Sequence, residues 1–427
     1  MYIPRTVVAL CVLLTASMAT RLALASTPPD DKDEDAALAL PVQSASPPRA
    51  SQAFYAALEL AQTDSSPDQG GIIDAQRASF DLRADYKLAS DWRAQMSDYL
   101  DLLWLGTFSD VAEINTLKEL YVSWQARSEL LVDVGRINIR QGVAYGYNPT
   151  DFLRADSLRT VDSIDPNSLR LTRLGTVMLR SQWLWDSGSL TALYAPELTE
   201  HASPAAWDPD IGATNSSRRW MISLSQRLLS SWTPQWIVFD TGTGTPQLGV
   251  NITRTISDAT ITYLEFAGGE SRSQFQQALQ TVGPAEWHSQ LAAGANYTFT
   301  NKLSIVLELE YDGSALTRHQ WSAARLGNPN QFERYVGYVA EQQEPPTLAS
   351  GFLAATWQDL LLRHLDLTAF LRRDLIDDSS LIYTELRYHW SHVDAALRRQ
   401  DYRGGPTTDY GLSPIRQSWQ LLLDYYL

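Results

Sequence analysis

The sequence has a single cysteine, Cys11, within the first 25 of its 427 residues. It therefore predicts neither an internal disulfide nor a cysteine-based metal site. Lysine is also scarce, since it occurs only at positions 32, 87, 118 and 302, and the net charge is −15. This acidic balance and the lack of a basic stripe argue against nucleic-acid binding.

Long apolar runs are missing after the N-terminal region, and no later stretch approaches 18 consecutive apolar residues. Together with a mean hydropathy of −0.23, this excludes a helical membrane protein. A transmembrane β-barrel remains compatible, because only every second residue of its strands faces lipid. The 14 Trp and 19 Tyr favour it modestly, because such rings gather at membrane interfaces.

The usual catalytic motifs are also missing. There is no HExxH zinc motif, no GxSxG elbow and no phosphate-binding glycine loop. The one arrangement that hints at an outer-membrane lipid hydrolase is His389 with Ser391, but no third orienting group accompanies it. We therefore expect a protein that is not an enzyme and needs neither a cofactor nor a metal.

The N-terminal region has the form of an export signal. Residues 1–25 carry Arg5, an apolar run from Val7 to Leu14 and a small-residue triplet ending at Ala25, which predicts a cleaved signal peptide. Residues 26–51 are rich in Pro, Ser and Asp, and we expect a disordered acidic periplasmic segment. No second linker follows, so residues 52–427 are predicted to form one domain.

That domain alternates apolar and polar residues in many short stretches, and helical periodicity never dominates a long window. Clear examples are SFDLRADYKL (79–88), LYVSWQA (120–126), RWMISLSQRL (219–228), KLSIVLELEY (302–311) and SLIYTELRYHW (380–390). Turn-rich pieces separate them, and a period of two indicates strands with one apolar face. The prediction is an all-β fold: a transmembrane antiparallel up-and-down barrel of 14 to 16 strands, with 16 favoured.

The last nine residues, WQLLLDYYL, alternate in the same way. One face is wholly apolar and consists of Trp419, Leu421, Leu423, Tyr425 and Leu427. This ending resembles the C-terminal strand of bacterial outer-membrane barrels, although Leu427 stands where Phe is commonest. The resemblance implies a strand that closes the barrel against the first one and is read by the barrel assembly machinery. It also implies the outer membrane of a Gram-negative bacterium, with lipid and lipopolysaccharide as surroundings.

A second resemblance lies at residues 134–154, VGRINIRQGVAYGYNPTDFLR. A strand with Gly-Arg that leads into an Asn-Pro loop is similar to a pattern in porin-like proteins of the alginate-export and related uncharacterised families. Asn148, Pro149 and Asp151 suit a turn. Residues 142–170 are then expected to form an inward-folded or extracellular loop. The motif can serve that turn or line the pore directly.

Arginines cluster around this motif, and facing rings of Arg and carboxylates are one way in which pores select solutes. Alternatively, the arginines simply pair with carboxylates along the wall. The candidate pore-lining or loop residues are Arg136, Arg140, Asn148, Asp151, Arg154, Arg173 and Arg180.

The function predicted from these features is a porin-like channel or export conduit for small, polyanionic or saccharide solutes. Periplasmic export partners are possible, and the oligomeric state stays open. The alternatives are a plugged structural or surface-interaction barrel, a lipid hydrolase, and a soluble secreted β-protein such as a propeller, whose repeats of roughly 40 to 50 residues are not visible.

Overall fold

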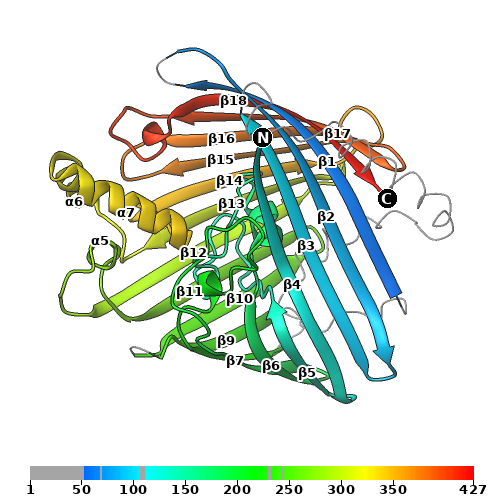
Figure 1. Cartoon of the computed structure of the whole chain (residues 1–427). Helices are drawn as coiled ribbons and strands as arrows, with labels where there is room; N and C mark the ends of the chain where they lie inside the picture. Colours follow the sequence, from blue (N-terminus) through cyan, green and yellow to red (C-terminus); the bar gives the residue numbers. More distant parts are fainter. Residues whose placement is uncertain (1–51, 68–69, 106–110, 229–231, 243–244) are drawn as a thin grey trace.

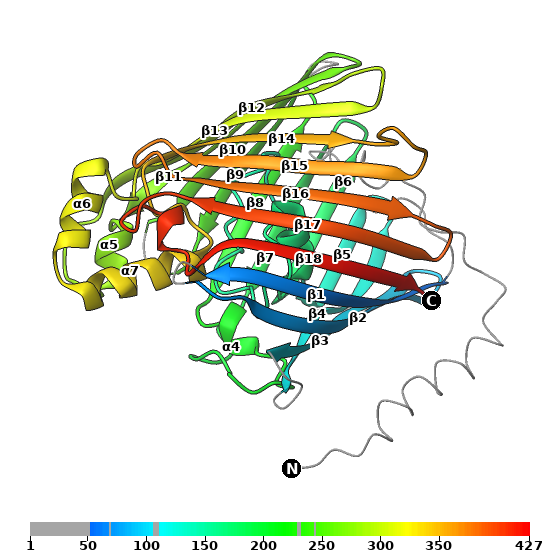
Figure 2. The same cartoon turned by 90° about the horizontal axis from the view of Figure 1, so that it is seen from above.

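The computed structural model describes residues 52–427, except 68–69, 106–110, 229–231 and 243–244. The predicted signal peptide 1–25 and acidic segment 26–51 lie outside the described residues. The rest forms a closed antiparallel barrel of 18 strands, as Figures 1 and 2 show from two sides. The predicted fold class is confirmed, but the predicted strand number of 14 to 16 was too low.

The strands follow one another around the wall in chain order, and β1 pairs with both β2 and β18. Their bounds are β1 Gln52–Pro67, β2 Ile73–Ala89, β3 Trp92–Leu105, β4 Val111–Arg127, β5 Leu130–Ile137, β6 Thr176–Trp185, β7 Gly188–Ala195, β8 Arg219–Gln226, β9 Trp232–Asp240, β10 Gln247–Ser257, β11 Thr260–Ser271, β12 Glu286–Thr298, β13 Leu303–Asp312, β14 Ala349–Trp357, β15 Leu365–Asp374, β16 Ser380–His389, β17 Val393–Arg403 and β18 Ile415–Tyr426.

The strand number was underestimated because one side of the wall is built from short strands. β5, β7 and β8 have eight residues each, fewer than the roughly ten of the spanning strand used for counting. In β9 the pattern is further obscured by Pro234, which cannot donate to the ladder. By contrast, β1 to β4 have 14 to 17 residues, and the alternating stretches 79–88 and 120–126 mark β2 and β4 in the sequence.

Alternation places the apolar face of each strand outside the barrel. On β13, Leu307 and Leu309 are 60% and 61% exposed on the outer surface, whereas Glu308 and Glu310 between them are buried inside. On β2, Arg77 and Ser79 are likewise buried inside, while Tyr86 and Leu88 are exposed outside. This is the arrangement of a barrel in lipid, with polar groups turned to the lumen.

The C-terminal strand closes the barrel as predicted. β18 pairs with β1 from Tyr426 opposite Ala57 to Ile415 opposite Pro67. Its predicted apolar face, Trp419, Leu421, Leu423, Tyr425 and Leu427, is exposed on the outside. The closure leaves no unpaired strand edge in the hydrocarbon.

The two ends of the barrel differ. The end near the C-terminus has tight turns, whereas the other end carries longer loops; in outer-membrane barrels these are the periplasmic and extracellular ends. At the tight-turn end, Trp92 and Trp124 stack on the outer surface with ring centroids 5.6 Å apart, as interface aromatics do.

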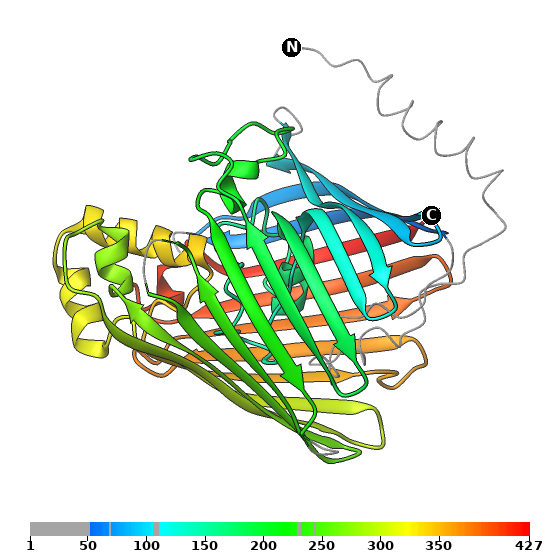
Figure 3. The same cartoon turned by 90° about the horizontal axis from the view of Figure 1, so that it is seen from below.

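Short helices lie in the loops, and Figure 3 shows α5, α6 and α7 gathered beyond the ends of the strands. A core of Leu316, Trp321, Phe332, Tyr335 and Val339 holds α6 and α7 together. Among the described residues, no helix is both long and apolar enough to cross a membrane. The helices are α3 Pro166–Thr172, α4 Ile211–Thr214, α5 Gln274–Ala278, α6 Arg318–Leu326, α7 Pro329–Gln342 and the 3-10 turn η1 Tyr410–Leu412.

Candidate functional site

The longest excursion into the barrel is the chain between β5 and β6, residues 138–175, which we call the inserted loop. It crosses the interior and reaches the inner faces of β11 and β13. The sequence left open whether this region folds inward or lies outside the barrel. The structure shows that it folds inward.

Two carboxylates of the far wall hold the start of the inserted loop. Glu265 on β11 accepts from the backbone amides of Val143 and Ala144, the latter at 2.6 Å. Glu308 on β13 accepts from the next three amides, 145 to 147, at 2.8, 3.1 and 3.1 Å. Five consecutive backbone N–H groups thus converge on two anions, the kind of concave site that binds negative charge.

The Asn-Pro-x-Asp motif follows directly and is buried against the same wall. Asn148 donates through Nδ2 to Glu265 at 2.9 Å and to the carbonyl of Ala144 at 2.7 Å. Thr150 donates through Oγ1 to Asn251 of β10 at 2.8 Å. These bonds join the motif to its own loop and to the barrel wall, so Asn148 serves the fold of the loop.

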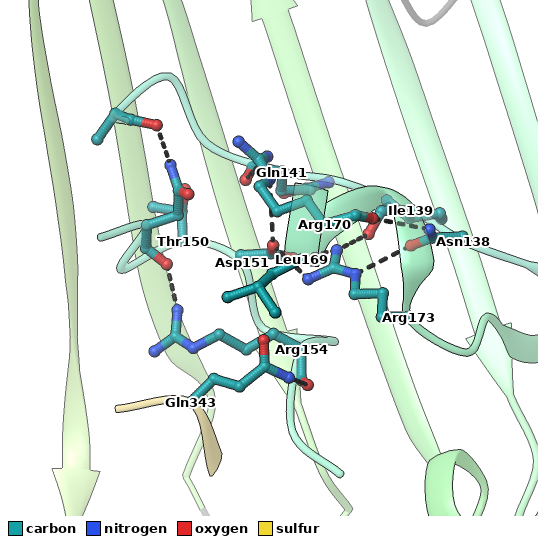
Figure 4. A network of polar contacts seen from close by, with 12 residues as sticks. Asn138, Ile139, Gln141, Thr150, Asp151, Arg154, Leu169, Arg170, Arg173 and Gln343 are labelled. Atoms are coloured by element: carbon teal, nitrogen blue, oxygen red, sulfur yellow. Dashed lines mark hydrogen bonds and ion pairs between the residues drawn. The ribbon is translucent and has the colours of Figure 1, made fainter. Parts of the chain in front are cut away.

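The next part of the loop is tied to its own return path. Arg173 is 2% exposed and donates to both oxygens of Asp151, at 2.8 and 3.1 Å (Figure 4). It also donates through Nε to Asn138 at 2.9 Å. Burial alone would raise the pKa of Asp151, but Arg173 and Arg170 outweigh it and hold that pKa below its usual value.

Helix α3 brings Arg170 and Arg173 to this place. Asp165 caps its first turn by accepting from the amide of Ser168 at 3.0 Å, and Pro166 occupies the first helical position. Arg170 lies in the last turn and donates to the carbonyl of Gln141 at 2.6 Å. The sequence DPNSLRLTR therefore makes a short helix of about two turns, whose end carries the two guanidinium groups.

A third tie joins the loop to the extracellular helices. Arg154 pairs with Glu344, which follows α7, and its guanidinium lies 5.0 Å from the centre of the Tyr147 ring. Tyr147 also donates to Glu344 at 2.6 Å. Burial raises the pKa of Glu344 to about 7, although Arg154 opposes that rise. The inserted loop and α7 are thus one connected unit.

Arg136 has a different role from that of Arg173. It lies on β5 and donates only to backbone carbonyls: Gly175 at 3.1 Å, Leu117 at 3.2 Å, Asp210 at 3.0 Å, and Pro209. These carbonyls surround a gap in the wall. β5 pairs with β4 only from Leu120 to Arg127, so the extracellular part of β4, residues 111–119, extends beyond β5. Arg136 therefore fills a gap in the wall.

Arg159 of the inserted loop fills the same gap on its extracellular side. It donates to the carbonyls of Asn115 at 2.7 Å, Asp208 at 2.5 Å and Ala205 at 2.8 Å. The backbone amide of Asn115 in turn donates to Ala206 at 2.8 Å. The chain between β7 and β8 thus replaces the missing part of β5 as the neighbour of β4.

The remaining two candidates, Arg180 and Arg140, differ in whether their side chains are engaged by a neighbouring carboxylate. Arg180 points inward from β6 and donates to Asp133 of β5 at 2.7 Å. Arg140 is exposed at the point where the chain leaves β5 for the interior. Of the seven predicted residues, Arg140 is the one whose exposure suits contact with a solute, and its pore-lining role stays a prediction.

The partners of the loop on the far wall were not predicted from the sequence. Glu308 and Glu310 were recognised as the polar face of a strand, but not as the groups that hold the loop. Glu310 pairs with Arg372 of β15 at 3.2 Å, and Arg372 also donates to the carbonyl of Gly146. Two carboxylates at alternate inward positions of one strand were the available signal.

The suggested hydrolase pair does not come together as a catalytic pair would. Both ring nitrogens of His389 face carboxylates, with Nδ1 2.9 Å from Asp394 and Nε2 3.5 Å from Asp366. Ser391 lies beyond the end of β16, in the turn before β17. His389 is therefore engaged in an ion-pair cluster and is not placed to activate this serine.

Comparison with known proteins supports the fold. No protein-family model matches the chain, and neither does any curated protein. Among solved structures, OpdQ of Pseudomonas aeruginosa is 10% identical with a TM-score of 0.53, covering 88% of this chain and 98% of that chain. OccAB1 of Acinetobacter baumannii is 9% identical with a TM-score of 0.51, covering 88% and 96%.

The outer membrane protein OpdK of Pseudomonas aeruginosa is also 9% identical, with a TM-score of 0.51 and coverage of 88% and 99%. At such low identity the likeness establishes the fold, which is that of bacterial outer-membrane porins. The predicted resemblance to porin-like barrels is confirmed at this level.

Proposed function

We propose that the chain is an outer-membrane channel that admits small polar solutes through a lumen narrowed by the inserted loop. The observation that carries this proposal is the docking of residues 143–147 onto Glu265 and Glu308. Charge-assisted hydrogen bonds hold a loop firmly, so the constriction keeps a fixed shape. A fixed constriction in a barrel with a polar inner face is suited to selecting solutes by size and charge.

Among the solute classes considered, the geometry favours small solutes over a polyanionic chain. A polyanion needs a row of guanidinium groups free to bind it, whereas Arg136, Arg154 and Arg173 already donate to carbonyls or carboxylates. Neutral saccharides remain compatible, because they need hydrogen-bonding groups and no net charge.

The test is single-channel conductance and reversal potential of the detergent-folded protein in a planar bilayer under a KCl gradient. We expect steady conductance, and Glu308→Ala should raise it by roughly twofold by releasing the loop. Glu333→Ala, which removes an exposed carboxylate of α7, is the matched control and should change nothing. Liposome swelling with sugars of increasing size then measures the size limit.

A plugged structural barrel is the second candidate, and the burial of Thr150, Asp151 and Ser157 within the inserted loop favours it. It predicts a protein that inserts but stays silent until the loop is released. Silence of the unaltered chain together with conductance of Glu308→Ala would therefore replace the open channel by a plugged one.

We also propose that the barrel assembly machinery reads β18, because its apolar residues face outward at the closing seam. Replacing Leu421 and Leu423 by Ser should reduce the amount of folded, heat-modifiable protein in outer membranes. Replacement of the lumen-facing residues Ser418 and Gln420 by Ala on the same strand serves as the control. Equal membrane levels of both double variants would contradict this role.

A further inference from the structure

The lumen contains a cavity of about 500 Å³ that lies apart from the contacts of the inserted loop with β11 and β13. It lies in the extracellular half, between residues 159–162 of the inserted loop and the inner faces of β1 to β4, β17 and β18. Its volume falls within the usual range for small-molecule sites, roughly 300 to 1,000 Å³.

One wall of this cavity is apolar, which is unusual for the inside of a water-filled barrel. Leu103 and Leu105 of β3 and Ile114 of β4 line it, and Val161 faces it from the inserted loop. Leu105 is 63% exposed and Val161 is 62% exposed. Exposed apolar side chains inside a polar lumen are not needed for the passage of small ions, but they fit the body of a bound organic molecule.

The other end of the cavity is anionic. Arg77 of β2 pairs with Glu59 and with Asp162, and its Nε lies 3.9 Å from Asp101. One guanidinium thus lies among three carboxyl groups, and this end of the cavity is negative on balance. Asp101 and Asp162 both line the cavity, so their carboxyl groups are the ones that a donor on a bound molecule would face.

A second guanidinium does not change this balance. Arg159 also lines the cavity, but its Nη atoms donate to backbone carbonyls and its Nε lies 3.8 Å from Asp210. The positive charge of Arg159 is therefore offset by Asp210, outside the group around Arg77.

We propose that this cavity binds an amphipathic organic cation. Its apolar body lies against Leu103, Leu105 and Val161, and its ammonium group lies near Asp101 and Asp162. The inference rests on the channel function proposed above and names a solute class for the extracellular entrance. An anion with the same body is repelled, and a cation without the body has little to hold it.

Isothermal titration calorimetry of the full, detergent-folded chain tests the proposal, with protein-free micelles as the blank. The probes are benzylammonium chloride, sodium benzoate, which has the same ring and the opposite charge, and methylammonium chloride, which has no ring. We expect saturable one-to-one binding of benzylammonium that is roughly tenfold tighter than that of either other probe.

Two substitutions separate the two halves of the site. Val161→Asn and Asp162→Asn should each weaken benzylammonium binding by roughly fivefold to tenfold. Val161 is exposed, so its replacement leaves the fold intact, as heat modifiability will check. Val282→Asn, at a side chain 99% exposed between β11 and β12, and Asp258→Asn, in an exposed turn, are the matched controls and should leave binding unchanged.

Equal binding of benzylammonium and benzoate, absence of saturable binding, or insensitivity to both substitutions would overturn the proposal. Conductance distinguishes this failure from failure of the channel function. If benzylammonium binds but the protein conducts no KCl, the binding site is supported and the channel function is contradicted. If the protein conducts KCl but benzylammonium neither binds nor blocks it, the channel function is supported and the binding site is contradicted.

Discussion

Arg136, on β5 just before the inserted loop, and Arg173, near the end of that loop, stabilise different parts of the molecule. Arg173 neutralises one buried carboxylate, Asp151, and so holds the loop in its folded shape. Arg136 meets four carbonyls from three segments and so completes the barrel wall where β5 is too short. A cluster of arginines in a barrel sequence is thus not evidence that a solute meets them.

We expect the largest loss of stability for Arg173→Ala, which leaves Asp151 charged and buried. Breaking a buried ion pair by removing one partner costs about 3–5 kcal/mol, and we expect the inserted loop to lose its fixed position. Conductance noise and proteolysis of residues 138–175 should both rise. In Arg173→Ala/Asp151→Asn, part of the loss should be recovered, and a double variant no better than the single one would contradict the pairing argument.

Arg136→Ala should have the next largest effect, but on the wall. Four carbonyls lose a charged donor, and a net loss of about 3 kcal/mol follows from bonds of this kind. The midpoint of urea unfolding, followed by the heat-modifiable band, should fall. Arg136→Lys should recover little, because one ammonium cannot reach all four acceptors. Full stability of the lysine variant would show that charge alone matters here.

Docking of the inserted loop against α7 should depend on pH through Glu344. Because burial raises the pKa of Glu344 to about 7, its contribution to docking is complete below pH 4.5 and is lost as pH rises through 7. Docking should weaken by about 2 kcal/mol between pH 5 and pH 8, which loop proteolysis can measure. Glu344→Gln should remove this dependence, and a steeper one in that variant would mean that another group titrates.

Arg140→Ala should have the smallest effect on stability, within about 0.5 kcal/mol, because the side chain is exposed. Its effect should appear in selectivity instead. The reversal potential in a KCl gradient should shift toward cation preference when this positive charge is removed. An unchanged reversal potential with unchanged stability would remove Arg140 from the pore lining.

The fold was largely predictable because lipid and lumen impose opposite demands on neighbouring residues. Residues 79–88 and 302–311 show this directly, and the structure turns their apolar positions outward. The strand number was not predictable, since β7 is short and rich in small residues and Pro234 interrupts the pattern of β9.

The candidate site was predictable as a loop but not as a network. The motif at 148–151 marked a turn, and the structure places it there. The partners of the inserted loop, Glu265 and Glu308, are more than 100 residues away in sequence, and no local pattern joins them to the loop. The hydrogen bonds from Arg136 to carbonyls could likewise not be predicted, because every residue has a backbone carbonyl and no residue type identifies the ones that accept.

The uneven height of the wall has a mechanical consequence. A closed barrel has no free edge from which to fray, so unfolding must begin with the rupture of one seam between neighbouring strands. β2 and β3 are joined over fourteen residue pairs, whereas β4 and β5 share seven and β8 and β9 share six. We therefore expect rupture to begin on the side of β5 to β9, and backbone amides there should exchange with deuterium before those of β1 to β4.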